Sequence, residues 1–404
     1  MIASRFSFAS MITKLISMFV FLFSALALVV PSGYSYGPLL LFIPALFFLF
    51  VRPYPALTQE DKYVILALLA YSFAGLLINF FHHLPGRSYD SFSRFLFAVP
   101  VLLLLLRFRI NPNYFWAGLA VGAIGAGILA LDDIGIRASR YNNAIQFGDI
   151  SMLFSCLLIA GITHAKKIST WFFMLFIVGI VAGTVASILS LTRGGWLALP
   201  VAFSVFVFAT GFYRNAKNII LFLAVVSAVM IVIYPLKQTE IFKGRVDQTI
   251  DEIQRYNSDR DVSSSIGKRI VLWQLSVDMI AERPLLGWGS ISNYVQATEN
   301  APDILQQFNH VHNDFLDALV KRGVIGGLAL LGIFAVPFIL FYRKLKSVSV
   351  EAFRFAVAGM ILVSSTFVFG LTQAFFCHNS GAMVYVFMLV IIWTQVRQAE
   401  LTDS

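Results

Sequence analysis

Charged residues and cysteines are scarce in this chain of 404 residues. Only 13% of the residues are Asp, Glu, Lys or Arg, whereas 58% are hydrophobic, and the mean hydropathy is +0.80. A soluble protein of this length could not bury so much apolar surface, so the composition indicates an integral membrane protein. The two cysteines, Cys156 inside an apolar run and Cys377 near the end of another, give no firm indication of redox compartment.

The sequence also lacks the alternating pattern of porin strands and any cluster of metal-ligand residues. Its apolar runs are mostly 14 to 20 residues long, which suits α-helices that cross a hydrocarbon core of ~30 Å. A net charge of +9 would suggest a nucleic-acid partner for a soluble domain, but positive cytoplasmic loops explain much of it here. We therefore expect no nucleic-acid partner, no metal and no other cofactor.

The apolar runs predict an all-α polytopic membrane protein with about twelve transmembrane helices. We expect transmembrane helices 1–9 within residues 1–234, a periplasmic loop at 235–312, and the last three helices within 313–404. The predicted spans are 11–30, 38–51, 63–81, 93–106, 114–131, 148–163, 171–192, 195–212, 218–234, 324–342, 354–375 and 381–396.

The distribution of basic residues predicts the orientation. With both termini in the cytoplasm, fifteen Lys and Arg residues fall on the cytoplasmic side and five, all Arg, fall in the short outside loops. Arg5 and Lys14 precede an apolar run with Ala25-x-Ala27 near its end, so a cleaved signal peptide is an alternative to an uncleaved first span. Cleavage would not change the orientation of the remainder.

The long outside segment predicts two amphipathic helices that form a helical cap. In the first helix Phe242, Val246, Ile250 and Ile253 share a face. In the second, the apolar face comprises Ile266, Ile270, Trp273, Val277 and Ile280, with Ser265 as the expected N-cap and Pro284 after the end. Such helices are expected on the membrane-facing rim of the bundle.

Two histidines, an amide and a carboxylate stand together in His310-Val311-His312-Asn313-Asp314, just before a membrane span. If a residue near Asn309 caps a helix, both histidines lie in its first turn, where the helix dipole disfavours imidazolium. A neutral imidazole can act as a general base, which Asn313 and Asp314 could orient. Alternatively, the motif only caps a helix at the interface.

Several arginines gather at the same side of the predicted membrane. Arg193 precedes two glycines that predict a tight reversal at the end of a span, and Arg269 lies at the start of the second amphipathic helix. The alternatives are a snorkelling Arg193 and a lipid-facing Arg269. Arg137 and Arg140 are weaker candidates, and Arg322 follows the histidines, beside a Lys321 that we expect to be solvated.

Arginines beside a candidate base at the membrane edge suit a polyanionic lipid substrate such as a lipid diphosphate. Transport is a competing interpretation, but most predicted spans lack charge at their centres, where a transport path needs it.

The motifs resemble the signature of the O-antigen ligase and polymerase superfamily. The resemblance is carried by Thr192-Arg193-Gly194, by Arg269-Ile-Val-Leu-Trp273 with Arg283-Pro284-Leu-Leu-Gly287-Trp-Gly289, and by His310-Val311-His312-Asn313-Asp314-Phe315-Leu316 with Arg322-Gly323-x-x-Gly326. It implies a GT-C-like, metal-independent, inverting glycosyltransferase of the bacterial inner membrane whose active site faces the periplasm.

The resemblance further implies the substrates and the roles of individual residues. The donor would be a polysaccharide on undecaprenyl diphosphate and, for a ligase, the acceptor would be lipid A–core. His312 would be the catalytic base, Arg193, Arg269 and Arg140 would bind the donor diphosphate, and His310, Asn313, Asp314 and Arg322 would support them. A polymerase is the main alternative, and a protein O-oligosaccharyltransferase or a lipid-linked glycan transporter fits less well. The sequence does not decide which of the two histidines is the base.

Overall fold

The computed structural model describes residues 2–133, 136–163, 168–213, 240–259, 261–299 and 301–403, and within these ranges it contains helices and no strand. The predicted ninth span, 218–234, lies outside the described residues. The helices are α1 (Ile2–Leu26), α2 (Gly33–Phe48), α3 (Gln59–Phe81), η1 (Gly86–Tyr89), α4 (Asp90–Arg107), α5 (Pro112–Asp132), α6 (Ala144–Gly161), α7 (Thr170–Leu189), α8 (Arg193–Trp196), α9 (Ala198–Tyr213), α11 (Glu240–Asp259), α12 (Ser265–Glu282), α13 (Ile291–Ala297), η3 (Asp303–Gln307), α14 (Asp314–Lys344), α15 (Val350–Thr372), η4 (Phe375–Cys377) and α16 (Asn379–Asp403).

The described part of the chain holds nine helical segments that are long and apolar enough to cross a membrane, and α1 and α2 add two shorter apolar helices. These eleven segments correspond one to one with eleven of the predicted spans. The prediction of an all-α, multi-pass membrane protein is therefore confirmed. Helices satisfy their own backbone hydrogen bonds, which is why apolar runs of this length adopt them in lipid.

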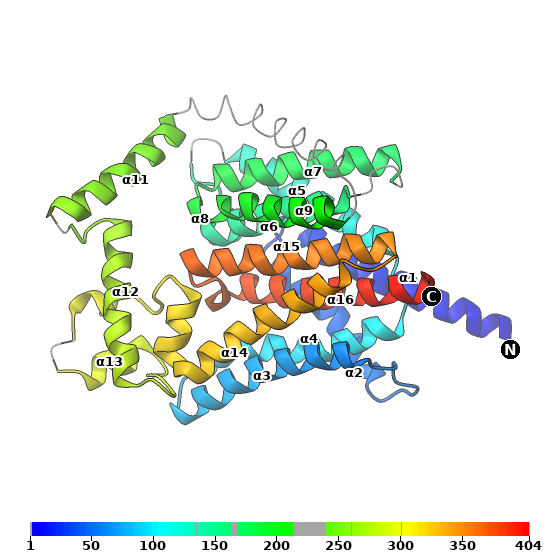
Figure 1. Cartoon of the computed structure of the whole chain (residues 1–404), viewed down its shortest axis with the longest axis horizontal. Coiled ribbons are helices and arrows are strands. Elements are labelled where there is room, and N and C mark those ends of the chain that lie inside the picture. The colour runs from blue at the N-terminus through cyan, green and yellow to red at the C-terminus, as the bar shows by residue number, and fades with distance from the viewer. Residues whose placement is uncertain are drawn as a thin grey trace.

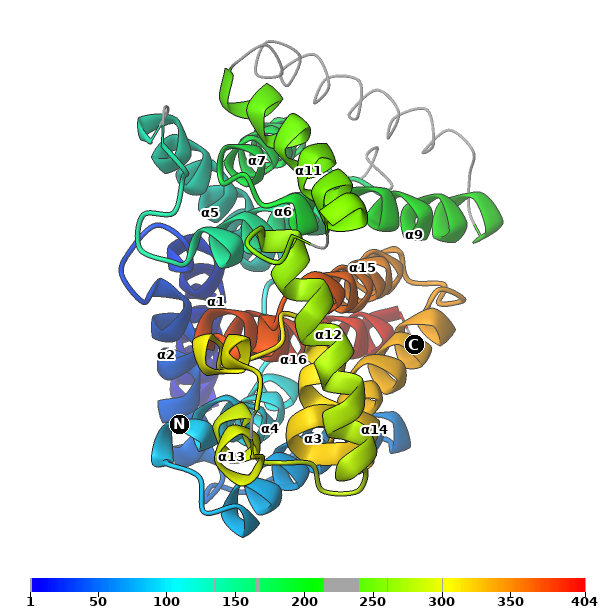
Figure 2. The ribbon, with the colours of Figure 1, turned by 90° about the vertical axis from the view of Figure 1, so that its left-hand side faces the viewer.

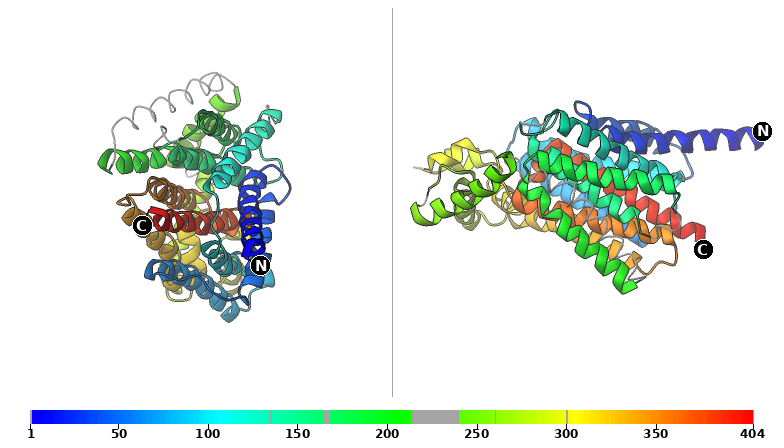
Figure 3. Two further views of the ribbon diagram at one scale, coloured as in Figure 1. Left: turned by 90° about the vertical axis from the view of Figure 1, so that its right-hand side faces the viewer. Right: turned by 90° about the horizontal axis from the view of Figure 1, so that it is seen from above.

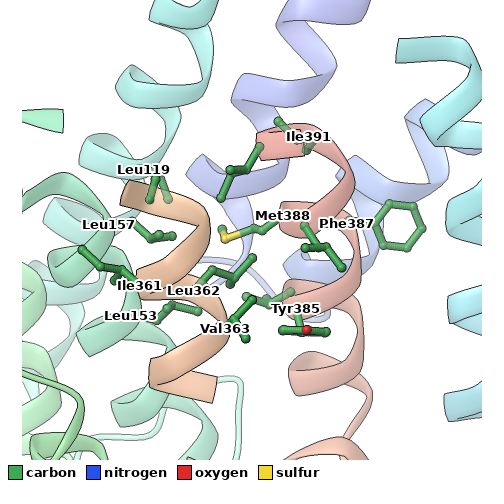
Figure 4. Packing of buried hydrophobic residues seen from close by; sticks show 14 of the residues in the cluster. Leu119, Leu153, Leu157, Ile361, Leu362, Val363, Tyr385, Phe387, Met388 and Ile391 are labelled. Atoms are coloured by element: carbon green, nitrogen blue, oxygen red, sulfur yellow. The ribbon is translucent and has the colours of Figure 1, made fainter. Parts of the chain in front are cut away.

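The apolar helices lie roughly side by side, with both chain termini at one end of the bundle and α11, α12 and α13 at the other (Figures 1 and 3). At the buried centre, α6 and α16 have most of their length covered by other helices. Leu153 and Leu157 of α6, Leu362 of α15 and Met388 of α16 all belong to this core, as Figure 4 shows. This close packing holds α6, α15 and α16 rigidly against one another.

Polar contacts join three helices at the end that carries the termini. The fully buried Asp61 of α3 accepts hydrogen bonds from Trp393 Nε1 (2.8 Å) and Arg397 Nε (3.2 Å) of α16. Lys344, at the end of α14, pairs with Glu60 at 2.6 Å and Glu400 at 3.0 Å. These pairs fix α3, α14 and α16 together at the end opposite the helical cap.

Helix α14 is broken at Gly323, whose φ of 59° and ψ of −161° are not helical. The break exposes the carbonyls of Val320 and Lys321, which accept hydrogen bonds from Trp288 N and Gly289 N, both at 2.8 Å. In turn, Val324 N donates to Pro284 O at 2.7 Å. The segment 283–289 that follows α12 thus docks into the break, and this ties the helical cap to the bundle.

Helix α12 crosses the end of the bundle (Figure 2) and differs from its prediction in two details. Its N-cap is Ser264, whose Oγ accepts from Gly267 N at 3.0 Å, and not Ser265. Its buried side chains are Leu272, Ser276 and Met279, whereas Val277 of the predicted face is 60% exposed. Which face of α12 is buried depends on the segments that pack against it, among them α14 and η3. The apolar periodicity of α12 itself carries no information about those segments.

Candidate functional site

The loop that carries the two histidines is held from both sides. Val311 is fully buried, its N donates to Asp317 Oδ1 at 3.3 Å, and its O accepts from Trp273 Nε1 at 2.9 Å. Asn313 Nδ2 donates to Leu371 O, at the end of α15, at 3.1 Å. Because α12, α14 and α15 all form hydrogen bonds with this loop, the histidines on either side of Val311 have fixed positions.

Both histidines precede α14, and the prediction that they lie in its first turn is wrong. Asn313 is the N-cap, and its Oδ1 accepts from Phe315 N at 2.9 Å and Leu316 N at 3.0 Å. His312 has a left-handed backbone with φ of 54°, which ends the helix on its N-terminal side. Asn is among the best N-cap residues, so it fixes the start of the helix after the histidines.

The imidazole rings of His310 and His312 are neighbours, with centroids 4.4 Å apart, and the ring of His378 lies 6.0 Å from that of His310. Burial lowers the pKa of both His310 and His312 to about 4, and it also lowers the pKa of His378. The three rings are therefore neutral at pH 7, as expected for the motif, but the main cause is burial and not a helix dipole.

A basic pocket of about 130 Å³ lies where the starts of α6, α8 and α12 meet the end of α15. Arg137, Arg193 and Arg269 line it, together with Ser265 and Thr372. Burial lowers the pKa of Arg269, and the next largest cause is the positive charge of Arg193, which confirms that the two cations are close. Such an arrangement of guanidinium groups favours a multiply charged anion.

Small residues allow the backbone to approach closely around Arg193. A Cβ at Gly194 would overlap the side chain of Thr372, and a Cβ at Gly195 would lie 2.7 Å from Asp149 Oδ1. The predicted tight reversal at these glycines is wrong, because both lie in the short helix α8 and the left-handed residue is Leu191, with φ of 56°. The glycines serve close packing, which places Arg193 against α6 and α15.

Arg140 lies outside this pocket. It pairs with Asp132, and its Nη1 lies 3.3 Å from Asp133 Oδ1. Arg137, three residues earlier, instead lines the pocket, and its Nε donates to Ser190 O at 2.8 Å. The structure thus brings Arg193 and Arg269 together as the sequence suggested, and it brings Arg137 to them in place of Arg140.

The basic pocket and the histidines are adjacent. Arg269 Nη1 donates to Thr372 O at 3.0 Å, one residue after the carbonyl of Leu371 that anchors Asn313. The charge of Arg269 also contributes to the lowered pKa of His312, where its influence exceeds that of Asp317. At His310, by contrast, Asp317 is the strongest charge and Arg269 is weaker. The pKa of His312 is therefore more sensitive to the charge of Arg269 than the pKa of His310 is.

A second, larger cavity of about 650 Å³ lies between α3, α4, α13 and α14. His310 and Arg322 line it, as does Asp314, whose carboxylate accepts from Phe375 N at 3.1 Å and Phe376 N at 3.2 Å. Lys321 also lines it and is not solvated as predicted, because its Nζ pairs with Asp317 at 2.9 Å.

Sequence reasoning missed His378 and the pair between Asp317 and Lys321. The pair has the i,i+4 spacing of helical ion pairs, which is a usable signal. His378 follows the penultimate span without any pattern that links it to His310, and only the packing of η4 beside α14 brings the two together. No group of His, Cys, Asp and Glu in the described residues has the arrangement of a metal site.

The fold and the site define a multi-pass helical membrane protein with a basic pocket and neutral histidines under a helical cap. A family model described as O-antigen ligase matches residues 178–331, the part of the chain that holds Arg193, Arg269 and His312. The match supports membership of the chain in the O-antigen ligase and polymerase family, and hence a function of that type. The chain is also similar to a protein of Haemophilus influenzae (strain ATCC 51907 / DSM 11121 / KW20 / Rd) described as uncharacterized, with 28% identity over 386 residues, which are 93% of this chain and 96% of the relative.

Proposed function

We propose that this protein is an O-antigen ligase. It transfers a polysaccharide from undecaprenyl diphosphate to lipid A–core, at the periplasmic face of the bacterial inner membrane. The observation that carries the proposal is the basic pocket of Arg137, Arg193 and Arg269 beside a neutral His312, at the end of the bundle opposite the termini. A lipid-anchored anion and a base are the two requirements of this transfer.

The basic pocket binds the diphosphate of the donor. Arginine donates two parallel hydrogen bonds to phosphate oxygens, and such charge-assisted bonds are stronger than neutral ones. Arg193 and Arg269 repel each other, as the lowered pKa of Arg269 indicates, and a bound dianion would relieve that repulsion. The same contacts stabilise the charge that develops on the leaving diphosphate as the glycosidic bond breaks.

His312 acts as the general base. Its ring nitrogen takes the proton of the acceptor hydroxyl, whose oxygen forms a bond to the anomeric carbon of the donor sugar. The bond from that carbon to the diphosphate oxygen breaks, and the electron pair leaves with undecaprenyl diphosphate. Attack from the face opposite the leaving group inverts the anomeric configuration, without a covalent enzyme intermediate. Asn313 and Asp314 hold the loop and η4 that position the histidines, and no metal takes part.

A reconstituted assay with purified protein, the lipid-linked glycan and lipid A–core tests the proposal. We expect the parent to place glycan on lipid A–core, in EDTA as well as without it, and we expect His312→Ala to lose that transfer while it remains folded. Arg255→Ala is the matched control, because this side chain is exposed on α11, away from the site.

Each other outcome of this assay contradicts a named part of the proposal. Chains that lengthen on the lipid carrier would identify a polymerase. Glycan on a protein acceptor would identify a protein O-oligosaccharyltransferase, and folded parent protein that forms no covalent product would point to transport. Substantial transfer by His312→Ala would remove His312 from the chemistry, and loss of activity in EDTA that a divalent cation restores would overturn the metal-free mechanism.

A further inference from the structure

The large cavity between α3, α4, α13 and α14 has no role in the donor binding proposed above. Its volume of about 650 Å³ is several times that of the basic pocket, at about 130 Å³, and the residues that line the two do not overlap. His310 lines the large cavity, and its ring stands 4.4 Å from that of His312. The histidine pair thus adjoins both cavities, His310 by lining the large one and His312 through the contacts of Asn313 and Arg269 with the end of α15, and such a pair can meet one substrate from each cavity.

Arg322 is the unusual residue of this cavity. The side chain is only 9% exposed, its guanidinium carbon lies 4.8 Å from the centre of the Phe92 ring, and no described residue accepts a hydrogen bond from its buried Nε. Among the described residues, no carboxylate lies within ion-pair distance of it. A buried cation without an ion partner is costly, so an anion that enters the cavity would be bound strongly.

The two nearby carboxylates already have other partners. Asp317 pairs with Lys321 and accepts from Val311 N, and Asp314 accepts from the backbone of Phe375 and Phe376. Both carboxylates are near enough to interact with the charge of Arg322, but neither forms a hydrogen bond or ion pair with its guanidinium, whose donors can therefore take a ligand. Asp90 also lines the cavity, at the start of α4, and Arg87 of η1 lines it beside Asp90.

The rest of the lining suits a saccharide. Four asparagine amides border the cavity, and amides bind hydroxyls as donors and acceptors, although two of the four also donate to backbone carbonyls, Asn79 Nδ2 to Ser88 O and Asn293 Nδ2 to Trp288 O. Aromatic rings supply apolar surface beside them. The amides belong to Asn79, Asn293, Asn309 and Asn379, and the rings to Tyr71, Phe92 and Phe376.

We propose that this cavity binds the acceptor saccharide and that Arg322 binds a phosphate or carboxylate group on it. The inference rests on the proposed function, since it requires a glycosyl acceptor that meets the donor at His312. From this side the acceptor hydroxyl gives its proton to His312, its oxygen bonds to the anomeric carbon, and the diphosphate departs toward Arg193 and Arg269. Arg322 contacts the substrate away from the reacting atoms and therefore sets affinity and specificity.

Steady-state kinetics with Arg322→Gln test the inference. We expect the KM for lipid A–core to rise about tenfold, the scale of one lost hydrogen bond to a charged group, and the KM for the donor to stay unchanged. Arg322→Lys should recover part of the loss, because the charge remains. Arg255→Gln on the exposed face of α11 is the matched control and should behave as the parent.

Modified acceptors identify the anion. The difference between parent and Arg322→Gln should vanish with an acceptor stripped of phosphate if Arg322 binds phosphate. It should vanish with a carboxyl-reduced acceptor if Arg322 binds a carboxylate. A tenfold difference that persists with both acceptors would overturn the anion contact.

A second variant tests the cavity without removal of a buried charge. Ser292 lines the cavity on α13 and is exposed, so Ser292→Trp should fold and should raise the KM for every form of the acceptor while leaving the donor KM unchanged. If the parent transfers glycan and both Arg322→Gln and Ser292→Trp keep the parental KM for the acceptor, this inference is rejected and the proposed function is not. Folded parent protein that transfers no glycan rejects the proposed function itself.

Discussion

At the scale of single residues, the backbone conformation of His312 determines where its imidazole, the proposed general base, is placed. Its left-handed backbone costs a non-glycine residue about 1–3 kcal/mol, and the surrounding contacts must hold it in place. The neighbours on both sides provide them, because Val311 is fully buried and Asn313 caps α14. The sharp turn between these anchors keeps the imidazole outside the helix and beside His310.

The lowered pKa of His312 predicts an unusual pH profile. The neutral imidazole is the active form, and its pKa is lowered from 6.5 to about 4, so kcat/KM should stay level through pH 6.5 and fall only as pH approaches about 4. The acid limb of kcat should lie at higher pH, because a bound diphosphate favours the imidazolium. Rates measured from pH 4 to 8 check this, and an acid limb of kcat/KM at 6.5 would contradict a buried base.

The third arginine of the basic pocket can be tested by a paired substitution. Arg137→Lys should raise the donor KM about tenfold or more, because Lys keeps the charge but loses the two-pronged geometry. Arg140→Lys should leave the donor KM near the parental value, since Arg140 is engaged by Asp132 and Asp133. Donor titrations of both variants measure this, and the reverse ranking would restore Arg140 as the diphosphate ligand.

At the scale of elements, the break in α14 explains two glycine motifs at once. Gly323 and Gly287 both have left-handed φ values, and a Cβ at either position would overlap the backbone of the facing segment. Without side chains, the two segments approach closely enough for Trp288 N and Gly289 N to satisfy the carbonyls that the break frees. The Arg322-Gly323-x-x-Gly326 motif downstream of His312 thus provides the site on α14 where the segment 283–289, which follows α12, packs.

A pair of glycine substitutions in α14 tests this docking. Gly323→Ala should lower the free energy of unfolding by roughly 2–4 kcal/mol. The loss is expected because alanine disfavours the left-handed conformation at this position and because its Cβ would overlap Leu285. Gly332→Ala is the control in the same helix, where a Cβ meets no atom within 4 Å, and it should gain up to about 1 kcal/mol. Thermal unfolding in detergent compares them, and equal stability of the two variants would show that the break tolerates a side chain.

At the scale of the whole molecule, the two chain ends and the helical cap lie at opposite ends of the bundle (Figure 1). The ion pairs of Lys344 and Arg397 stand at the end with the termini, whereas Arg193 and Arg269 stand at the other. Cytoplasmic termini and a periplasmic site are the orientation that the basic residues of the loops predict, and the two ends can be told apart by experiment.

Cysteine labelling tests that orientation. In a Cys377→Ser background, which removes the exposed native thiol, a membrane-impermeant maleimide should label Ser258→Cys in intact spheroplasts. It should label Val348→Cys, in the loop between α14 and α15, only after lysis. The opposite pattern would invert the protein in the membrane and place the site in the cytoplasm.

Much of the candidate site could be named from local pattern. Arg193, Arg269 and His312 stood out because charged or polar residues are costly at a membrane edge; the two arginines line one pocket and His312 adjoins it. His378 and the pairing of Lys321 could not be placed in the same way, because partners far apart in the chain meet only through helix packing. The choice between Arg137 and Arg140 likewise depends on which one finds Asp132 and Asp133.

The sequence by itself determined the membrane-spanning helices, because the length of each apolar run matches the bilayer and a helix satisfies its own backbone there. It did not determine the start of α14, because Asn309 and Asn313 are both good N-cap residues and only the structure shows that Asn313 is the one used. Only the tertiary structure decided which face of α12 is buried, where α14 breaks, and that His310 lines the large cavity while Arg193 and Arg269 line the basic pocket. Those features arise from contacts between segments far apart in the chain, and local preferences carry no information about such contacts.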